Sequence, residues 1–349
     1  MINQREKKKN CVELMQKNPN IIYLLIGMLF FIGIINQNVY TNSEVKSLNT
    51  ADSEVKVVTT TTILRDYAQE IIGDEGVVSV IIDEGMCPGH YDYTPSDINL
   101  VIGADIVFYH GFEWDQFLEP LLDAAANKDA AYSMSGNGSL GYTQWGSPGN
   151  VPLFLDVICE HLNNTYPSLS DTFNQNNAAY KNEVALKKAE IESQNAALYN
   201  FTDVKAYIMN HQTAFMTWLG FNITGSWSKD DNSMTPSDLA TIIDGAYITN
   251  TEIIVMNYQS GTEQGKAAAD YLGIASVPLQ NFPGMYGIQT YLEQLDFNIA
   301  LLNWALNDGP DPRASENGTI GPNLLIPISI FATISIVSLV LYSKRSTKK

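Results

Sequence analysis

The chain has 349 residues, 45% of them hydrophobic, and a formal net charge of −18 at pH 7. This length exceeds what one small core needs and is typical of a globular part with two lobes. The negative charge argues against nucleic-acid binding, because neutralising phosphates requires the opposite sign.

Both ends of the chain carry apolar runs. Residues 21–35 follow a basic stretch with Arg5 and Lys7, which predicts a signal peptide or a signal anchor. Residues 324–342 contain no charge and precede a basic tail at 343–349, which predicts a single-pass transmembrane anchor. Positive charge at both outer flanks predicts that the bulk of the chain lies outside the cell membrane.

The predicted extracellular part is strongly acidic. Between the two apolar runs there are 11 basic and 36 acidic residues, a net charge of −25. Surface solubility explains such a charge, and so does a local field that attracts cations. Five Asn-x-Ser/Thr sequons also suit an extracellular glycoprotein, and they begin at Asn137, Asn163, Asn200, Asn222 and Asn317.

Composition and breaks divide the chain into segments. The expected order is a cytoplasmic tail, signal segment and tether at 1–54, an N-terminal α/β lobe at 55–170, a long linking helix within 171–204, a C-terminal α/β lobe at 205–307, a stalk at 308–323, the transmembrane anchor at 324–342 and a cytoplasmic tail at 343–349.

The first loop of the N-terminal lobe gathers metal-ligand chemistry. After a β-branched strand at 55–61, Cys87, His90 and Asp92 fall within six residues, around a Pro-Gly pair. The loop ends in Thr94-Pro-Ser-Asp97, where a capping Thr, a Pro at the first helical position and an acidic first turn predict a helix start. Thiol and imidazole groups on a loop anchored to a helix favour a metal-binding pocket. A disulfide between Cys87 and Cys159 is the structural alternative.

A similar unit recurs in the second half of the chain. Thr94-Pro-Ser-Asp97 leads to a buried strand at 106–111, and Thr235-Pro-Ser-Asp238 leads to another at 253–257. Two such lobes place their strand-end loops around a shared cleft, where ligands bind in α/β sheets. Between the lobes, residues 174–200 contain neither Gly nor Pro and carry one apolar face, which predicts a single long helix joining them.

These segments, taken in order, resemble a known family. They are the opening strand at 57–62, Tyr91-x-x-Thr-Pro-Ser-Asp97, Ala104-Asp-Ile-Val-Phe-Tyr109, the long helix, His211-x-x-Ala-Phe215, the second Thr-Pro-Ser-Asp and a closing helix from Thr290 to Leu306. Together they resemble the metal-binding solute-binding proteins of ABC importers, of the zinc and manganese type, in a divergent branch with a Cys-Pro-Gly-His loop. The resemblance implies two α/β lobes bridged by one long helix, with a metal cleft between them.

The resemblance also implies where the ligands lie. The first family His falls at Gly89, beside His90, and the second falls at Pro152, which has no side-chain donor. The third falls at His211, and the fourth, an Asp, falls at Gln280.

From the residues themselves, the candidate metal ligands are Cys87, His90, His110, His211 and Gln280. His110 ends a buried strand, and it is either a ligand or a loop His bonded to backbone. His161 lies on an amphipathic segment and is expected to be solvated.

The predicted function follows from this resemblance. It is a membrane-anchored extracytoplasmic component that captures a divalent transition metal and passes it to an ABC permease with its ATPase subunit. Zinc is the first choice, because thiolate and imidazole suit it, with manganese, iron, nickel or copper as alternatives. An enzyme is not expected, since the chain has no Gly-x-Ser-x-Gly, His-Glu-x-x-His or phosphate-loop motif. The rival interpretation is an adhesin-like or structural surface protein that has lost its metal.

Overall fold

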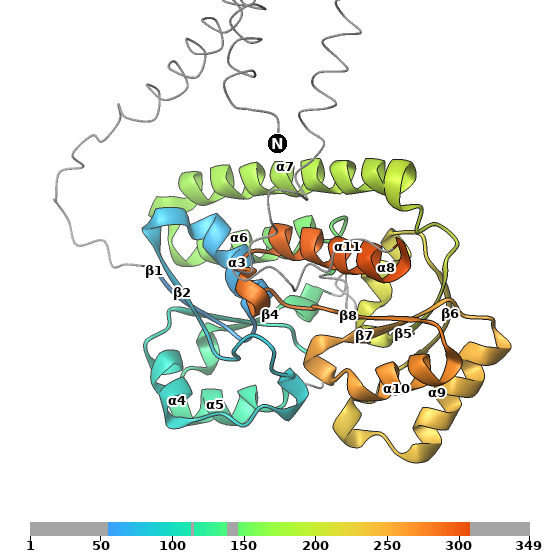
Figure 1. Cartoon of the computed structure of the whole chain (residues 1–349). Helices are drawn as coiled ribbons and strands as arrows, with labels where there is room; N and C mark the ends of the chain where they lie inside the picture. Colours follow the sequence, from blue (N-terminus) through green and yellow to red (C-terminus); the bar gives the residue numbers. More distant parts are fainter. Residues whose placement is uncertain (1–54, 113–114, 138–145, 308–349) are drawn as a thin grey trace, which may run out of the picture. The chain divides into compact units, whose positions relative to one another are not determined.

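The computed structural model describes residues 55–112, 115–137 and 146–307 (Figure 1). It contains two sheets, each of four parallel strands. The N-terminal sheet has the order β2-β1-β3-β4, with β1 Val55–Thr59, β2 Gly76–Val80, β3 Ile106–Tyr109 and β4 Ala131–Ser133. The C-terminal sheet has the order β6-β5-β7-β8, with β5 Lys205–Met209, β6 Asn222–Trp227, β7 Ile253–Asn257 and β8 Ala275–Leu279. The matching strand orders confirm the predicted pair of α/β lobes.

The strands form where the sequence has short β-branched runs. β1 reads Val-Lys-Val-Val-Thr, and four of its five residues are buried. All five residues of β7 are buried. Continuous burial is expected for parallel strands, because helices cover both faces of such a sheet. In the register, Val57 lies opposite Val78 and Ile106 at the centre of the first sheet.

Helices flank each sheet. In the N-terminal lobe they are α3 Thr62–Ile72, α4 Pro95–Ile102, α5 Leu118–Ala125 and α6 Val151–Thr165. In the C-terminal lobe they are α8 Thr213–Trp218, α9 Pro236–Ile248, α10 Glu263–Leu272 and α11 Tyr291–Asn307. Both Thr-Pro-Ser-Asp motifs begin helices as predicted. Asp97 accepts a hydrogen bond from the backbone N–H of Thr94 at 2.6 Å, and Asp238 accepts one from that of Thr235 at 2.8 Å.

One long helix, α7 Ser170–Gln194, runs alongside both lobes (Figure 1). The sequence predicted this helix over 174–200. In the structure it begins four residues earlier and ends six residues earlier than predicted. A π-helical turn, Asn195–Tyr199, follows it and closes at Asn200 in the left-handed region. The Asn195 side chain donates to the carbonyl of Leu219 and accepts from the N–H of Phe201, both at 2.9 Å. These tertiary bonds end the α-helical hydrogen-bond pattern at this point.

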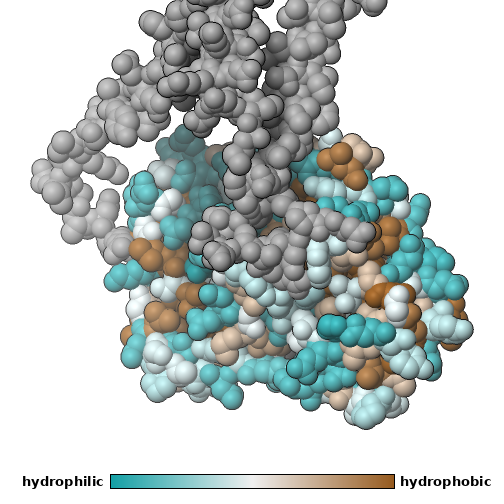
Figure 2. All heavy atoms as spheres, viewed as in Figure 1, coloured by the Kyte–Doolittle hydropathy of each residue, from teal (hydrophilic) through white to brown (hydrophobic). Residues whose placement is uncertain are grey.

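The two lobes share a core along α7. Buried apolar side chains from α3, α6, α7, β5 and α11 form one continuous cluster. Each lobe also has a smaller cluster on its other side, beneath α4 and α5 in the first lobe and beneath α9 and α10 in the second. On the face shown in Figure 2, polar residues dominate and apolar ones form separate patches.

Within the described ranges, no helix is both long enough and apolar enough to cross a membrane. The predicted signal segment at 21–35, the stalk at 308–323, the anchor at 324–342 and the tail at 343–349 lie outside the described residues.

Candidate metal centre

The first part of the site is the loop before α4. Pro88–His90 forms a 3-10 turn, in which the N–H of His90 donates to the carbonyl of Cys87 at 3.1 Å. The Tyr91 hydroxyl donates to the carbonyl of Ile81 at 3.1 Å and to Asp97 at 2.9 Å. The loop is therefore fixed between the end of β2 and the start of α4. Cys87 lies half-buried beside the exposed His90.

The second part is the loop that follows β6 in the other lobe. Asp231 accepts a hydrogen bond from the N–H of Glu263 at 2.6 Å, at the N-terminus of α10. Asp230, its neighbour, accepts one from the N–H of Ser233 at 3.2 Å. Gly261 has φ +98°, and a Cβ there would lie 2.5 Å from the Asp231 carboxyl. The loop is thus seated on α10, and Asp230 projects toward the first lobe.

The two loops bring three ligand types together. One donor atom from each of Cys87, His90 and Asp230 lies within 4.8 Å of the others. His90 Nε2 lies 3.2 Å from Asp230 Oδ2 across the lobes. This is an ion-pair distance, and it is also close to the roughly 3.3 Å that separates two tetrahedral zinc ligands with bonds of about 2.0–2.1 Å.

Asp230 was not predicted from the sequence. It follows a strand end in the C-terminal lobe, just before the second capping box, and this position could have suggested a cleft carboxylate. Its partner residues, however, lie about 140 positions earlier in the chain.

His211 lies on the inner side of the same cleft. It lines a pocket of about 180 Å³ with Cys87 and Asp230, and Phe282 forms part of the wall. The rest of the lining is neutral, namely Pro88, Gly89, Ser228, Asn257, Gln259, Ser260 and Asn281. Burial lowers the pKa of His211 to about 4, an effect that Asp230 partly opposes. The imidazole is therefore neutral at pH 7, the form that binds a metal.

Burial also shifts the pKa of the Cys87 thiol. It raises the pKa of Cys87, against the opposing effect of the Gly89 backbone N–H, while the Asp230 charge raises it further. A bound metal would have to displace the proton, as zinc does from coordinating thiols. Cys87 and Cys159 are both free thiols, so the alternative of a disulfide between them is wrong.

The other predicted ligands lie away from this cluster. His110 is completely buried, with Nε2 2.9 Å from the Thr61 hydroxyl and its ring 6.0 Å from that of Phe282. Burial lowers the pKa of His110 to about 3. Gln280 is 1% exposed and does not line the pocket, although its neighbour Asn281 does.

Pro152 and His161, which the sequence analysis also considered, both lie on α6. Pro152 sits in the first turn of α6, where a proline is well accommodated. His161 was expected to be solvated, but it is only partly exposed and stacks on Tyr132 at a ring distance of 3.9 Å.

Comparison with known proteins identifies the family of this chain. The family model described as "zinc-uptake complex component A, periplasmic" matches residues 57–305. The manganese-binding lipoprotein MntA of Halalkalibacterium halodurans is 23% identical over 259 residues, which are 70% of this chain and 86% of that protein. The iron-binding protein YfeA of Yersinia pestis is 28% identical over 150 residues, which are 40% of this chain and about half (48%) of that protein.

Solved structures share the fold. The solute-binding protein FpvC of Pseudomonas aeruginosa, solved with Ni²⁺, superposes with a TM-score of 0.64 at 18% identity, covering 73% of this chain and 98% of FpvC. The chain therefore belongs to the zinc-uptake component A family of metal-binding solute-binding proteins, which are not enzymes. Other relatives are named as substrate-binding lipoproteins of metal ABC transporters.

Proposed function

We propose that this protein captures a divalent transition metal, zinc first, in the cleft between its lobes and delivers it to an ABC permease driven by an ATPase subunit. The proposal rests chiefly on one observation. Cys87 and His90 of one lobe meet Asp230 of the other, with donor atoms within 4.8 Å. An ion bound there would link the two lobes through ligands from each of them.

The donor types favour zinc among the divalent metals. Zinc binds thiolate, imidazole and carboxylate in four-coordinate sites, whereas manganese prefers an oxygen-rich shell. The relatives named above are described as binding manganese and iron. A half-buried Cys87 in the cleft is the feature by which we assign zinc to this chain instead.

We further propose that residues 324–342 anchor the protein in the cell membrane. Some relatives are described as lipoproteins, but no Cys lies within the 50 residues after the first apolar run of this chain. Expression of the full chain and of a chain ending at residue 307 separates the possibilities. Release of the shorter chain into the medium supports the C-terminal anchor. Retention on the membrane would instead assign anchoring to residues 21–35 or to a lipid.

Glycosylation is proposed at two of the sequons. Asn200 and Asn222 are exposed, at a turn after α7 and at the start of β6. The amide of Asn163, in contrast, donates to the side chain of Asn174 at 3.0 Å and to the sulfur of Cys159 at 3.6 Å, and a glycan would replace one of the two hydrogens that make these bonds. Mass analysis of the expressed protein should find glycans on the exposed pair and none on Asn163.

Metal content tests the main proposal. The full chain, purified in detergent without a histidine tag, should carry close to one zinc per molecule. After removal of the metal, added zinc should raise the melting temperature, since a ligand at 100 times its Kd stabilises the folded state by about 2.7 kcal/mol. Manganese should shift the melting temperature less. If zinc, manganese, iron, nickel and copper all leave it unchanged, the metal-importer assignment fails and the adhesin-like interpretation gains.

A further inference from the structure

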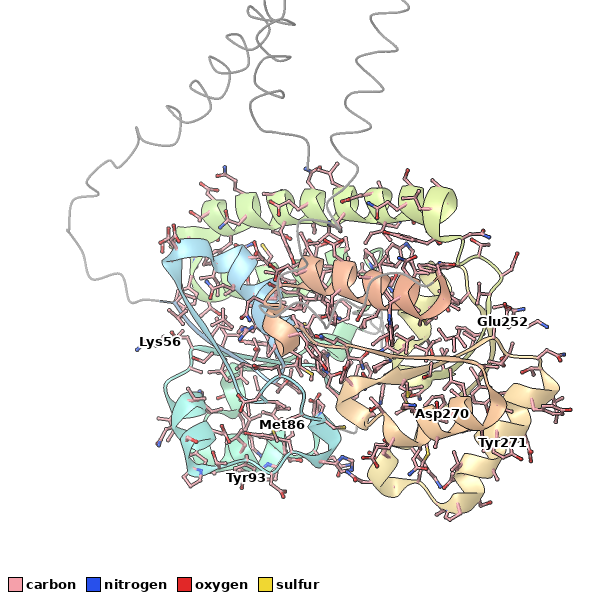
Figure 3. The ribbon with its side chains drawn as sticks, viewed as in Figure 1. Lys56, Met86, Tyr93, Glu252, Asp270 and Tyr271 are labelled. Carbon is pink, nitrogen blue, oxygen red and sulfur yellow. The ribbon has the colours of Figure 1, made fainter. Side chains whose placement is uncertain are left out.

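Two pockets meet at the metal cluster. The inner pocket, described above, has about 180 Å³ and includes His211. The outer pocket has about 480 Å³ and includes His90 together with Met86, which is labelled in Figure 3. Four residues line both pockets, and they are Cys87, Asp230, Gln259 and Ser260. Cys87 and Asp230 therefore stand between two spaces, each of which has its own histidine.

The two histidines differ in access to solvent. The side chain of His90 is 49% exposed, whereas His211 is only partly exposed and stands outside the cluster that Cys87, His90 and Asp230 form within 4.8 Å. The outer pocket also carries carboxylates from Asp230, Asp231 and Glu263, and neither Lys nor Arg is among its described lining residues. Such a lining attracts cations from solution. The inner pocket is smaller, and Phe282 together with neutral amides encloses it.

We infer that the ion occupies two positions in succession. In the outer position Cys87, His90 and Asp230 bind it, and in the inner position Cys87, Asp230 and His211 bind it. Transfer exchanges one imidazole for the other, while the thiolate and the carboxylate remain bound. This inference rests on the proposed function and adds an entry route to it.

The exchange is chemically simple. The bond from the metal to His90 breaks and the bond to His211 forms, so the charge of the complex does not change and no electron moves. The thiol proton of Cys87 leaves to water when the ion first binds. Zinc has no geometric preference from its d-electrons and can expand to five ligands, so both imidazoles can bind briefly together. Each position has three protein ligands and leaves the fourth place to water, and the 49% exposure of the His90 side chain keeps the outer position open to exchange with solvent.

Rapid mixing of the full-length, metal-free protein in detergent with Co²⁺ tests this route. The absorption bands of cobalt report the coordination number and geometry at each position, and Cys87 contributes a thiolate band from the first step. Wild type should show a fast phase whose rate rises with cobalt concentration, followed by a slower phase whose rate does not.

Two histidine variants should affect different phases. His211→Ala should keep the fast phase, lose the slow one and release cobalt roughly a hundredfold faster, because even outer partners of metal ligands change affinity 10- to 100-fold. His90→Ala should slow the fast phase and weaken equilibrium binding less than His211→Ala does. His211→Gln serves if the alanine variant does not fold. His161→Ala is the matched control and should leave both phases unchanged, since His161 lies on α6 and lines neither pocket.

The outcomes separate the two proposals. A single phase in wild type, with equal loss of affinity in both histidine variants, overturns the two-position route and leaves one shared site. If wild type binds neither cobalt nor zinc, the proposed function itself fails.

Discussion

Asp66 is a buried carboxyl at the junction of both lobes and α7. Its Oδ2 accepts hydrogen bonds from the Tyr180 hydroxyl of α7 at 2.8 Å and from the Tyr291 N–H of α11 at 3.0 Å. Burial raises the pKa of Asp66 from 3.8 to about 7, although both hydrogen bonds partly offset this effect. The nearby Glu70 raises the pKa further and Arg65 lowers it. The carboxyl should therefore be largely protonated at pH 5 and ionised at pH 8.

The sign of the resulting pH dependence follows from proton binding. Between pH 4 and 7 the folded state holds a proton on Asp66 that the unfolded state has lost, so stability falls as the pH rises through that window. The interval between 3.8 and about 7 spans roughly three pH units, which corresponds to about 4 kcal/mol. We expect Asp66→Asn to abolish this loss. Its side-chain oxygen can keep both hydrogen bonds, and the amide stays neutral at every pH.

Denaturant unfolding of wild type and Asp66→Asn from pH 4.5 to 8 measures the effect. The two proteins should have similar stability at pH 4.5, and the variant should be more stable by several kcal/mol at pH 8. Asp238→Asn is the control of opposite sign. Its carboxyl pairs with Lys229 and accepts hydrogen bonds from Thr235, and these contacts hold its pKa below the usual range. This variant should therefore lose stability at neutral pH. If the difference in unfolding free energy between wild type and Asp66→Asn stays constant with pH, the reasoning is refuted.

Three further predictions concern the site and one helix cap. Cys87→Ser should remove the thiolate-to-cobalt absorption band and weaken zinc binding, because a hydroxyl is a far poorer zinc ligand than a thiolate. An unchanged cobalt spectrum would exclude Cys87 from the site. Asp231→Ala should lower zinc affinity roughly tenfold in a competition titration with a chromogenic chelator, because the loop that carries Asp230 loses its hydrogen bond to α10. Asp231→Asn should keep most of the zinc affinity, since its side-chain oxygen can still accept that bond. Equal losses of affinity in the two variants would indicate that Asp231 is itself a ligand. Thr235→Ala should lower the free energy of unfolding in denaturant by about 1 kcal/mol, since the Thr235 hydroxyl caps α9. Thr241→Ala, on the exposed face of the same helix, is the control and should lower it less. The reverse order would contradict the capping assignment.

The sequence by itself determined the elements whose signals are local. A β-branched run and two buried, uncharged runs predicted the strands at 55–61, 106–111 and 253–257, Thr-Pro-Ser-Asp predicted two helix starts, and the absence of Gly and Pro predicted the long linking helix. These signals depend on neighbours within a few residues along the chain, which is why they survive in the folded protein. The order of such elements, together with the motifs between them, also carried the resemblance to the metal-binding family that the comparisons confirmed.

Only the tertiary structure decided which side chains meet. Cys87 and His90 were visible as a ligand pair on one loop, but Asp230 joins them because Asp231 and Gly261 seat its loop on α10. His110 was an equally good candidate by residue type, yet β3 directs it into the interior, where it contacts Thr61. The end of α7 likewise depends on the bonds of Asn195 to a distant segment. In each case the deciding contacts join residues far apart in sequence, and local chemistry cannot fix a distance across a cleft.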